Sequence, residues 1–147
     1  MTEFLFVIVS VAFFSYGGYM AAGKSRRRKL FFQAWYGFHV RFLEEVSYRR
    51  RPLGECLLQG FAPFDKLLRQ EPFRPPHYLT AEEAAELNEY LAEIGTTDAA
   101  TQRKYLEAKS QSLQNLRDKS QAEYRQKKDL GLRLGSLLGL AVAILMI

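Results

Sequence analysis

The stretch whose residue types and spacing best match a known chemistry is GYMAAGKS, from Gly18 to Ser25. It satisfies the pattern G-x-x-x-x-G-K-S, in which backbone N–H groups cradle phosphates and the lysine contacts the β- and γ-phosphates of a nucleotide. That chemistry needs a strand before the loop and a parallel sheet around it. Here a long apolar segment precedes the motif, and the rest of the chain has a helical pattern. A membrane-tethered nucleotide-binding protein is therefore kept as the alternative function.

Few other residues belong to types that carry catalysis or bind metals. The chain has one cysteine, Cys56, and two histidines, His39 and His77. A lone cysteine excludes an intramolecular disulfide and a cysteine-based zinc site, and the two histidines lack a ligand spacing. Glu44 and Glu45 are adjacent, so they point in different directions on a helix and do not form a catalytic dyad. The sequence predicts a protein that is not an enzyme and uses no cofactor or metal.

The elements that surround these residues begin and end in apolar segments. Phe4 to Gly23 carries no charge, and as a helix it would span ~30 Å, the thickness of a bilayer core. A buried core helix or a cleaved signal peptide would need an amphipathic pattern or a positive start, and the segment has neither. Leu130 to Ile147 has one charged side chain, Arg133, which can reach back to the headgroups. We predict transmembrane helices over residues 1–23 and 130–147.

Small residues recur at every fourth position of the second apolar segment. They are Gly131, Gly135, Gly139 and Ala143. On a helix these residues share one face, which lets a partner backbone approach closely inside a membrane. We predict that this face packs against the first apolar segment or against another copy of the chain in a homo-oligomer.

Basic clusters flank the inner ends of both apolar segments. They are Lys24, Arg26, Arg27, Arg28 and Lys29 after the first segment, and Arg125, Lys127 and Lys128 before the second. The positive-inside rule places both clusters in the cytoplasm, with both termini outside and a cytoplasmic domain over residues 24–129. Bases interleaved with aromatic residues also occur in nucleic-acid-binding proteins. Their place beside a membrane segment favours contact with membrane lipids, and no nucleic-acid partner is expected.

The middle of the chain predicts an all-α domain. All five prolines lie between Pro52 and Pro76, and the flanking regions can form long helices because they contain none. One such helix is expected from Lys24 to about Arg50, where apolar residues recur at spacings of three and four. Its stripe consists of Phe31, Trp35, Phe38, Phe42 and Val46.

Two further helices have recognisable ends. Thr80 and Glu83 form a capping box, and Gly95 ends the helix that the box opens. Thr97 or Asp98 then caps a last helix, which nothing interrupts before the membrane glycines. The predicted fold is an all-α, membrane-anchored antiparallel helical bundle with an N-terminal and a C-terminal transmembrane helix.

The first of these two helices is acidic. Residues 82–98 hold six acids and no base: Glu82, Glu83, Glu86, Glu89, Glu93 and Asp98. One interpretation is that the helix balances the basic helices on either side of it within the bundle. The other is that Glu82, Glu86 and Glu89 form an acidic docking surface for a partner.

Two motifs resemble the stage III sporulation protein AB family. LEEVSYRRRPLGECL, from Leu43 to Leu57, resembles its E-I-x-Y-x-x-x-P-L-x-E-A segment, with Cys56 in place of the alanine. The matching residues are Glu45, Val46, Tyr48, Pro52, Leu53 and Glu55. The second motif resembles L-T-x-x-E followed by L-G-x-x-D-x-x-x-Q-x-x-x-L. Its matching residues are Leu79, Thr80, Glu83, Gly95, Asp98, Gln102 and Leu106. The segment between the motifs, Gly60 to Tyr78, is shorter than is usual in the family.

The resemblance implies a role that the residue patterns alone do not give. The family resembles the cytoplasmic helical-bundle domain of the inner-membrane platform protein of type II secretion systems. It implies a non-enzymatic platform or adaptor in the channel between mother cell and forespore. The implied partners are a secretion-type ATPase, stage III sporulation protein AA, and other sporulation channel proteins. The implied location is the mother-cell (outer forespore) membrane, with the soluble domain in the mother-cell cytoplasm.

Overall fold

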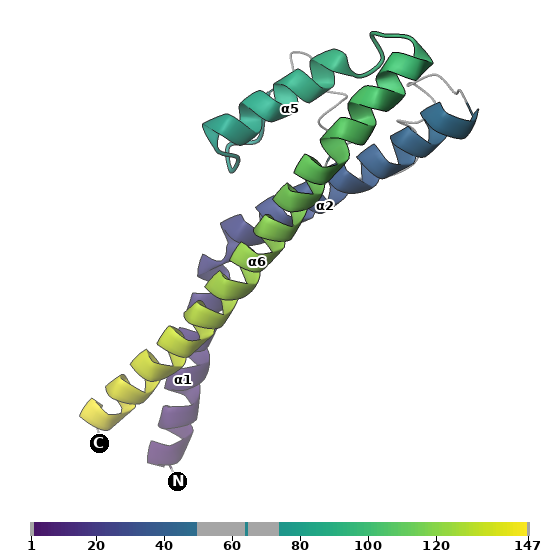
Figure 1. Cartoon of the computed structure of the whole chain (residues 1–147). Coiled ribbons are helices and arrows are strands. Elements are labelled where there is room, and N and C mark those ends of the chain that lie inside the picture. The colour runs from purple at the N-terminus through teal and green to yellow at the C-terminus, as the bar shows by residue number, and fades with distance from the viewer. Residues whose placement is uncertain (1, 50–63, 65–73, 147) are drawn as a thin grey trace. The chain divides into compact units, whose positions relative to one another are not determined.

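The computed structural model of the chain describes residues 2–49, 64 and 74–146, which form helices joined by turns, with no strand among them (Figure 1). The helices are α1 (Thr2–Ala21), α2 (Gly23–Glu44), the π-helical turn η1 (Glu45–Arg49), α5 (Ala81–Glu93) and α6 (Ala99–Met146). The all-α prediction is confirmed for these residues. The predicted motif residues Pro52, Leu53 and Glu55 lie outside the described residues, as does Cys56.

The chain divides into two compact units. The first, here called the terminal unit, comprises Met1–Arg27 and Ser120–Ile147. The second, here called the central unit, comprises Arg28–Lys119. Helix α6 is continuous and contributes its first part to the central unit and its second part to the terminal unit.

The terminal unit contains the first predicted membrane segment. Within the described residues, Phe4–Ala21 of α1 is the one window long and apolar enough to cross a membrane. Large side chains along it stay exposed, including Phe4 at 73% and Phe13 at 71%. The second predicted segment, residues 130–147, is described as far as residue 146 and forms the end of α6; its role as a transmembrane helix stays a prediction.

A single turn residue separates the first two helices. The Ala22 N–H donates to the carbonyl oxygen of Tyr19 at 3.2 Å, three residues back, and α2 then begins at Gly23. The helix predicted from Lys24 to about Arg50 is thus found one residue earlier. It ends in the π-helical turn η1 rather than in regular α-helix.

Aromatic side chains fill the core of the central unit. The predicted stripe on α2 is buried at Phe31, Trp35 and Phe38, each at most 2% exposed. The Trp35 ring stacks on Phe64 with 6.3 Å between centroids and meets Tyr90 of α5 edge-on at 5.4 Å. Such ring pairs add about 0.5–1.5 kcal/mol each beyond the area they bury. Helix α6 completes this core with Leu106 and Leu113.

The predicted helix ends are confirmed. The Thr80 hydroxyl accepts the Glu83 N–H at 3.2 Å, and the Glu83 carboxylate accepts the Thr80 N–H at 2.9 Å, which completes the capping box. Gly95 adopts φ 79°, a left-handed conformation that favours glycine after a helix. Of the two residues predicted to cap α6, Asp98 does so, because its carboxylate accepts the Thr101 N–H at 3.3 Å.

Candidate functional site

The small residues of α6 lie against α1 within the terminal unit. They are Gly131, Gly135, Gly139 and Ala143, of which Gly135, Gly139 and Ala143 are buried. A Cβ on Gly139 would lie 2.6 Å from the Val11 Cα, and one on Gly131 would lie 2.5 Å from the Gly18 carbonyl oxygen. Carbon atoms do not approach backbone atoms so closely, so glycine at these positions is what lets the two helices touch. The structure therefore gives this face a partner within the same chain.

The residues that match the phosphate-loop pattern begin at this contact between α1 and α6. Gly18 faces the Gly131 backbone from the last turns of α1, so the residues before the motif form a helix and not a strand. The rest of the match runs through the turn at Ala22 into the first turn of α2, where Ser25 is 4% exposed. A magnesium-binding hydroxyl would need to face a nucleotide instead. The nucleotide-binding interpretation is not supported.

The basic residues predicted to set the topology separate into two groups. Lys24, Arg26 and Arg27 are exposed in the terminal unit. Arg125 and Lys127 are exposed in the same unit, and Lys128 is half-buried. Lys29 and Arg28 belong to the central unit, where both are partly buried.

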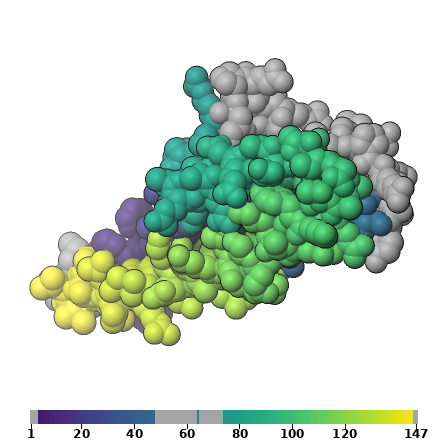
Figure 2. All heavy atoms as spheres, turned by 45° about the horizontal axis from the view of Figure 1, so that its top comes forward, coloured from purple at the N-terminus to yellow at the C-terminus, as the bar shows by residue number. Residues whose placement is uncertain are grey.

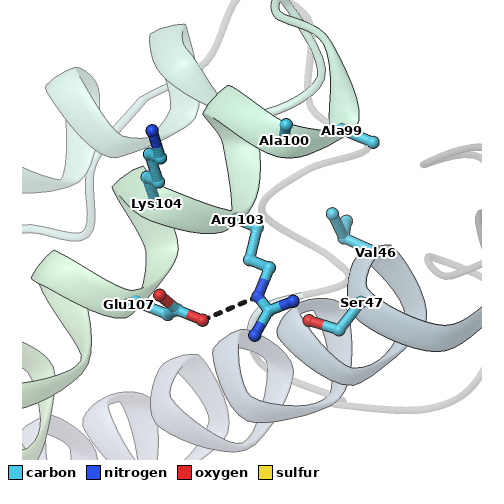
Figure 3. A pocket seen from close by; sticks show the side chains of 7 residues that line it. All are labelled: Val46, Ser47, Ala99, Ala100, Arg103, Lys104 and Glu107. Carbon is cyan, nitrogen blue, oxygen red and sulfur yellow. Dashed lines mark hydrogen bonds and ion pairs between the residues drawn. The ribbon is translucent and has the colours of Figure 1, made fainter.

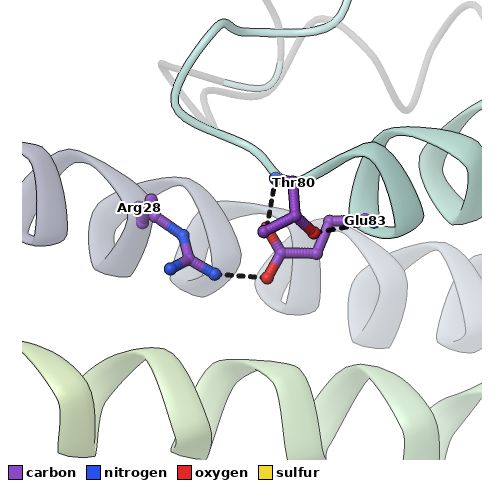
Figure 4. A network of polar contacts seen from close by, with 3 residues as sticks. All are labelled: Arg28, Thr80 and Glu83. Atoms are coloured by element: carbon purple, nitrogen blue, oxygen red, sulfur yellow. Dashed lines mark hydrogen bonds and ion pairs between the residues drawn. The ribbon is translucent and has the colours of Figure 1, made fainter.

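Arg28 takes part in a partly buried network with the capping box (Figure 4). Its guanidinium forms an ion pair with the Glu83 carboxylate, whose side chain is 9% exposed. One carboxylate oxygen receives Arg28 and the other receives the Thr80 N–H. Removing one member of such a pair would leave a buried charge without its counter-charge, so the network fixes the start of α5 on α2.

The second family motif forms the turn between α5 and α6. Gly95 supplies the positive φ, and Asp98 caps α6. Gln102 closes the turn because its side-chain Oε1 accepts the Gly95 N–H at 2.8 Å. Gln102 is only 3% exposed. The spacing G-x-x-D-x-x-x-Q is therefore explained by the hydrogen bonds of one helix–turn–helix connection.

The first motif meets the second at an open pocket of about 410 Å³ (Figure 3). Val46 and Ser47 line it from the π-helical turn. Helix α6 contributes Arg103 and Glu107, which are four positions apart and are joined by a hydrogen bond of 2.7 Å. The remaining lining residues are Ala99, Ala100 and Lys104. Glu45 of the first motif, which precedes Val46 in the chain, is buried. The pocket joins residues that are more than fifty positions apart in the chain. Turns of π-helix often occur at functional sites.

The acidic residues of α5 have different environments. Glu82 is exposed, whereas Glu86 is half-buried and accepts the Ser112 hydroxyl of α6 at 2.7 Å. Glu89 forms an ion pair of 3.1 Å with Lys109 of α6 but keeps 61% of its side chain exposed. Helix α5 and the first part of α6 form a continuous surface in the space-filling view (Figure 2). Two of the three candidate docking residues thus also join α5 to α6.

A family model for stage III sporulation protein AB matches residues 69–147. The chain belongs to the stage III sporulation protein AB family. The match includes α5, the turn formed by Gly95, Asp98 and Gln102, and the whole of α6 with its glycines. Neither a curated protein nor a solved structure matches the chain.

Sequence reasoning missed the polar centre of this family member's aromatic core. His39 is 0% exposed and lies between Tyr90 of α5, whose hydroxyl is 3.1 Å from Nδ1, and Ser110 of α6, whose Oγ is 2.8 Å from Nε2. The Ser110 hydroxyl donates its proton to the Leu106 carbonyl, so its oxygen must accept from Nε2–H. Nδ1 then accepts the Tyr90 hydroxyl proton. His39 thus joins α2, α5 and α6 as a neutral imidazole.

Burial controls the protonation of this cluster. Desolvation lowers the pKa of His39 from 6.5 to about 4, because the buried imidazolium would lose its water. Desolvation also raises the pKa of the Tyr90 hydroxyl well above its ordinary value of 10.0. Both side chains are therefore neutral near pH 7, which suits a structural hydrogen-bond network better than proton transfer.

Proposed function

We propose that this protein is a non-enzymatic membrane platform or adaptor of the sporulation channel complex between mother cell and forespore. In this proposal α1 and the end of α6 cross the mother-cell membrane, and the central unit is an antiparallel helical bundle in the mother-cell cytoplasm. The bundle would engage a secretion-type ATPase, as the resemblance to type II secretion platforms implies. Membership of a stage III sporulation family supports the process, and the helix pair supports the anchor.

The observation that carries the proposal is the apolar surface of the glycine-packed helix pair. Helix α1 and the end of α6 already use their small residues against each other, yet their large apolar side chains remain exposed. On α6, Leu137 is 62% exposed, Ile144 74% and Leu145 85%. A water-soluble protein rarely leaves so continuous an apolar surface uncovered, whereas in a bilayer these side chains contact lipid.

Charge supports a partner surface on the central unit. The exposed carboxylates of Glu82 and Glu89 lie on α5 without a base among the residues 82–98. Complementary charge speeds encounter and orients partners, so a basic surface of the ATPase would be suited to this helix. Glu86 contributes less to such a surface because it is half-buried against Ser112.

The test is co-purification of the detergent-solubilised full chain with stage III sporulation protein AA. The double variant Glu82→Lys/Glu89→Lys should retain several-fold less ATPase than the wild type, and added salt should weaken the wild-type complex. Glu107→Lys/Asp118→Lys is the matched control, since it reverses two exposed acids of α6 that, like Glu89, have basic partners. Equal retention by both double variants would contradict docking through α5, and no retention by the wild type would contradict the ATPase role.

A further inference from the structure

A second feature of the helix pair is a groove that the chain itself does not fill. It has a volume of about 590 Å³ and runs between α1 and α6 in the terminal unit. Its walls include Phe13, Tyr16, Gly17 and Met20 of α1 and Leu134 and Leu138 of α6. Volumes of this size are typical of sites for small ligands. The lining is apolar apart from the Tyr16 hydroxyl, so an apolar ligand is required.

The groove is open at Gly17, whereas the adjacent Gly18 is in close contact with α6. A Cβ on Gly18 would collide with the Gly131 backbone, whereas a Cβ on Gly17 would have no other atom within 4 Å. The side chains on either side of Gly17 project outward, with Phe13 71% and Met20 60% exposed. The missing side chain of Gly17 thus leaves a gap between two large ones.

Basic residues lie at one end of this groove. Lys127 and Lys128 precede Gly131 by four and three positions on the continuous helix α6, so they extend that wall by one turn. Lys24 follows Met20 by four positions and lies in the first turn of α2, just past the turn at Ala22. The exposed acid on the nearby turn of α6 is Asp129. Over residues 24–27 and 120–133 seven bases face two acids, a net charge of +5.

We propose that this groove binds one anionic phospholipid of the bilayer, with an acyl chain beside Gly17 and the phosphate between Lys24, Lys127 and Lys128. The inference rests on the proposed function, because it places α1 and the end of α6 in the membrane. Basic residues at the cytoplasmic end of a transmembrane helix pair attract anionic headgroups, and an apolar groove accepts the chain below them. An anionic phospholipid therefore matches both parts of the site, with its phosphate at the basic residues and its acyl chain in the apolar groove.

Steric and charge arguments favour a lipid over another transmembrane helix. Close helix packing requires small residues on the contact face, but Phe13, Tyr16 and Met20 project on both sides of Gly17. A flexible acyl chain fits between such side chains. A second copy of this chain would also bring its own basic cluster to the same end, where the two clusters would repel each other.

The experiment measures lipid retention by native mass spectrometry of the full chain, purified in detergent and incubated with phosphatidylglycerol or phosphatidylcholine. The wild type should retain one phosphatidylglycerol and little phosphatidylcholine. Lys127→Gln/Lys128→Gln should weaken phosphatidylglycerol binding on the order of 30-fold, since each base contributes roughly a factor of five at a membrane surface. The control Arg74→Gln/Lys119→Gln removes two exposed bases of the central unit and should have no effect.

A second pair of variants tests the groove itself. Gly17→Leu fills the open space and should abolish retention, whereas Gly23→Leu, where a Cβ also has no neighbour within 4 Å, should not. Equal retention of the two lipids by the wild type, or normal retention by Gly17→Leu, would overturn the site. If Gly17→Leu instead reduced crosslinking between chains and left lipid binding unchanged, the groove would be a protein interface. Failure of the membrane proposal is distinct, because the chain would then stay soluble without detergent and retain neither lipid.

Discussion

At the scale of single residues, His39 of α2 connects that helix to α5 and α6. Its neutral ring accepts a proton from Tyr90 at one nitrogen and donates to Ser110 at the other. Because the ring is buried, protonation in the folded state requires an imidazolium among Phe38, Tyr90 and other aromatic side chains. The cluster therefore couples folding to pH.

The folded pKa of His39, about 4, lies below the value of 6.5 expected in the unfolded chain. Between these two pH values the unfolded state binds more protons than the folded state. The contribution of neutral His39 to the free energy of unfolding is therefore complete above pH 6.5 and is lost as pH falls towards 4. The loss amounts to about 3 kcal/mol. Chemical denaturation of the detergent-solubilised chain from pH 7 to 4 should show a steeper decline than in His39→Gln, whose amide can replace both hydrogen bonds. Parallel declines would show that His39 does not control this dependence.

At this scale, the sequence predicted contacts between residues that are close to each other in the chain. The capping box of Thr80 and Glu83 was predictable because its partners are three positions apart. The same Glu83 also pairs with Arg28, fifty-five positions away, and Arg28 was assigned only to membrane topology. His39 was likewise treated as one lone histidine, because Tyr90 and Ser110 come next to it only after three helices pack. Long-range polar pairs leave no spacing pattern in a single sequence.

At the scale of helices, the spacing of the glycines predicted that they form a packing face, but it did not identify the helix that packs there. The spacing of Gly131, Gly135 and Gly139 predicted a close-packed face but left open which helix would occupy it. The structure places α1 there, and it distinguishes Gly18, which touches Gly131, from the adjacent Gly17, which does not. Sequence alone treats these two neighbours as equivalent.

This difference predicts opposite effects of one substitution at adjacent positions. Gly17→Ala should stabilise α1 by up to ~1 kcal/mol, because alanine favours helix and its methyl group has open space. Gly18→Ala should destabilise the helix pair instead, because its methyl group would overlap the Gly131 carbonyl. Thermal unfolding of the two detergent-solubilised variants, followed by circular dichroism, measures both effects. Equal melting temperatures would contradict the close contact between α1 and α6.

At the scale of the whole molecule, one continuous helix runs from the family motif to the apolar C-terminal segment. Helix α6 begins at the Asp98 cap, packs with Leu106 and Leu113 in the central unit, and ends in the terminal unit. The sequence predicted an unbroken helix from Asp98 to the glycines, because no helix breaker lies between them, but it left open whether the helix continues through the last segment. The crossing of a membrane by the end of α6 stays a prediction, since apolar length alone does not distinguish a spanning helix from one that lies against a membrane.

The topology proposed for the molecule therefore depends on the two ends of the chain together. If α1 and residues 130–147 both cross, the basic clusters lie in the cytoplasm and Thr2 and Leu145 lie on the opposite side. Single cysteines at Thr2, Leu145 or Lys104, each introduced in a Cys56→Ser background, report this arrangement in intact protoplasts. An impermeant maleimide should label Thr2→Cys and Leu145→Cys before lysis, and Lys104→Cys, in the central unit, only after it. Labelling of Thr2→Cys but not Leu145→Cys would show that α6 does not cross, and labelling of Lys104→Cys in intact protoplasts would reverse the topology.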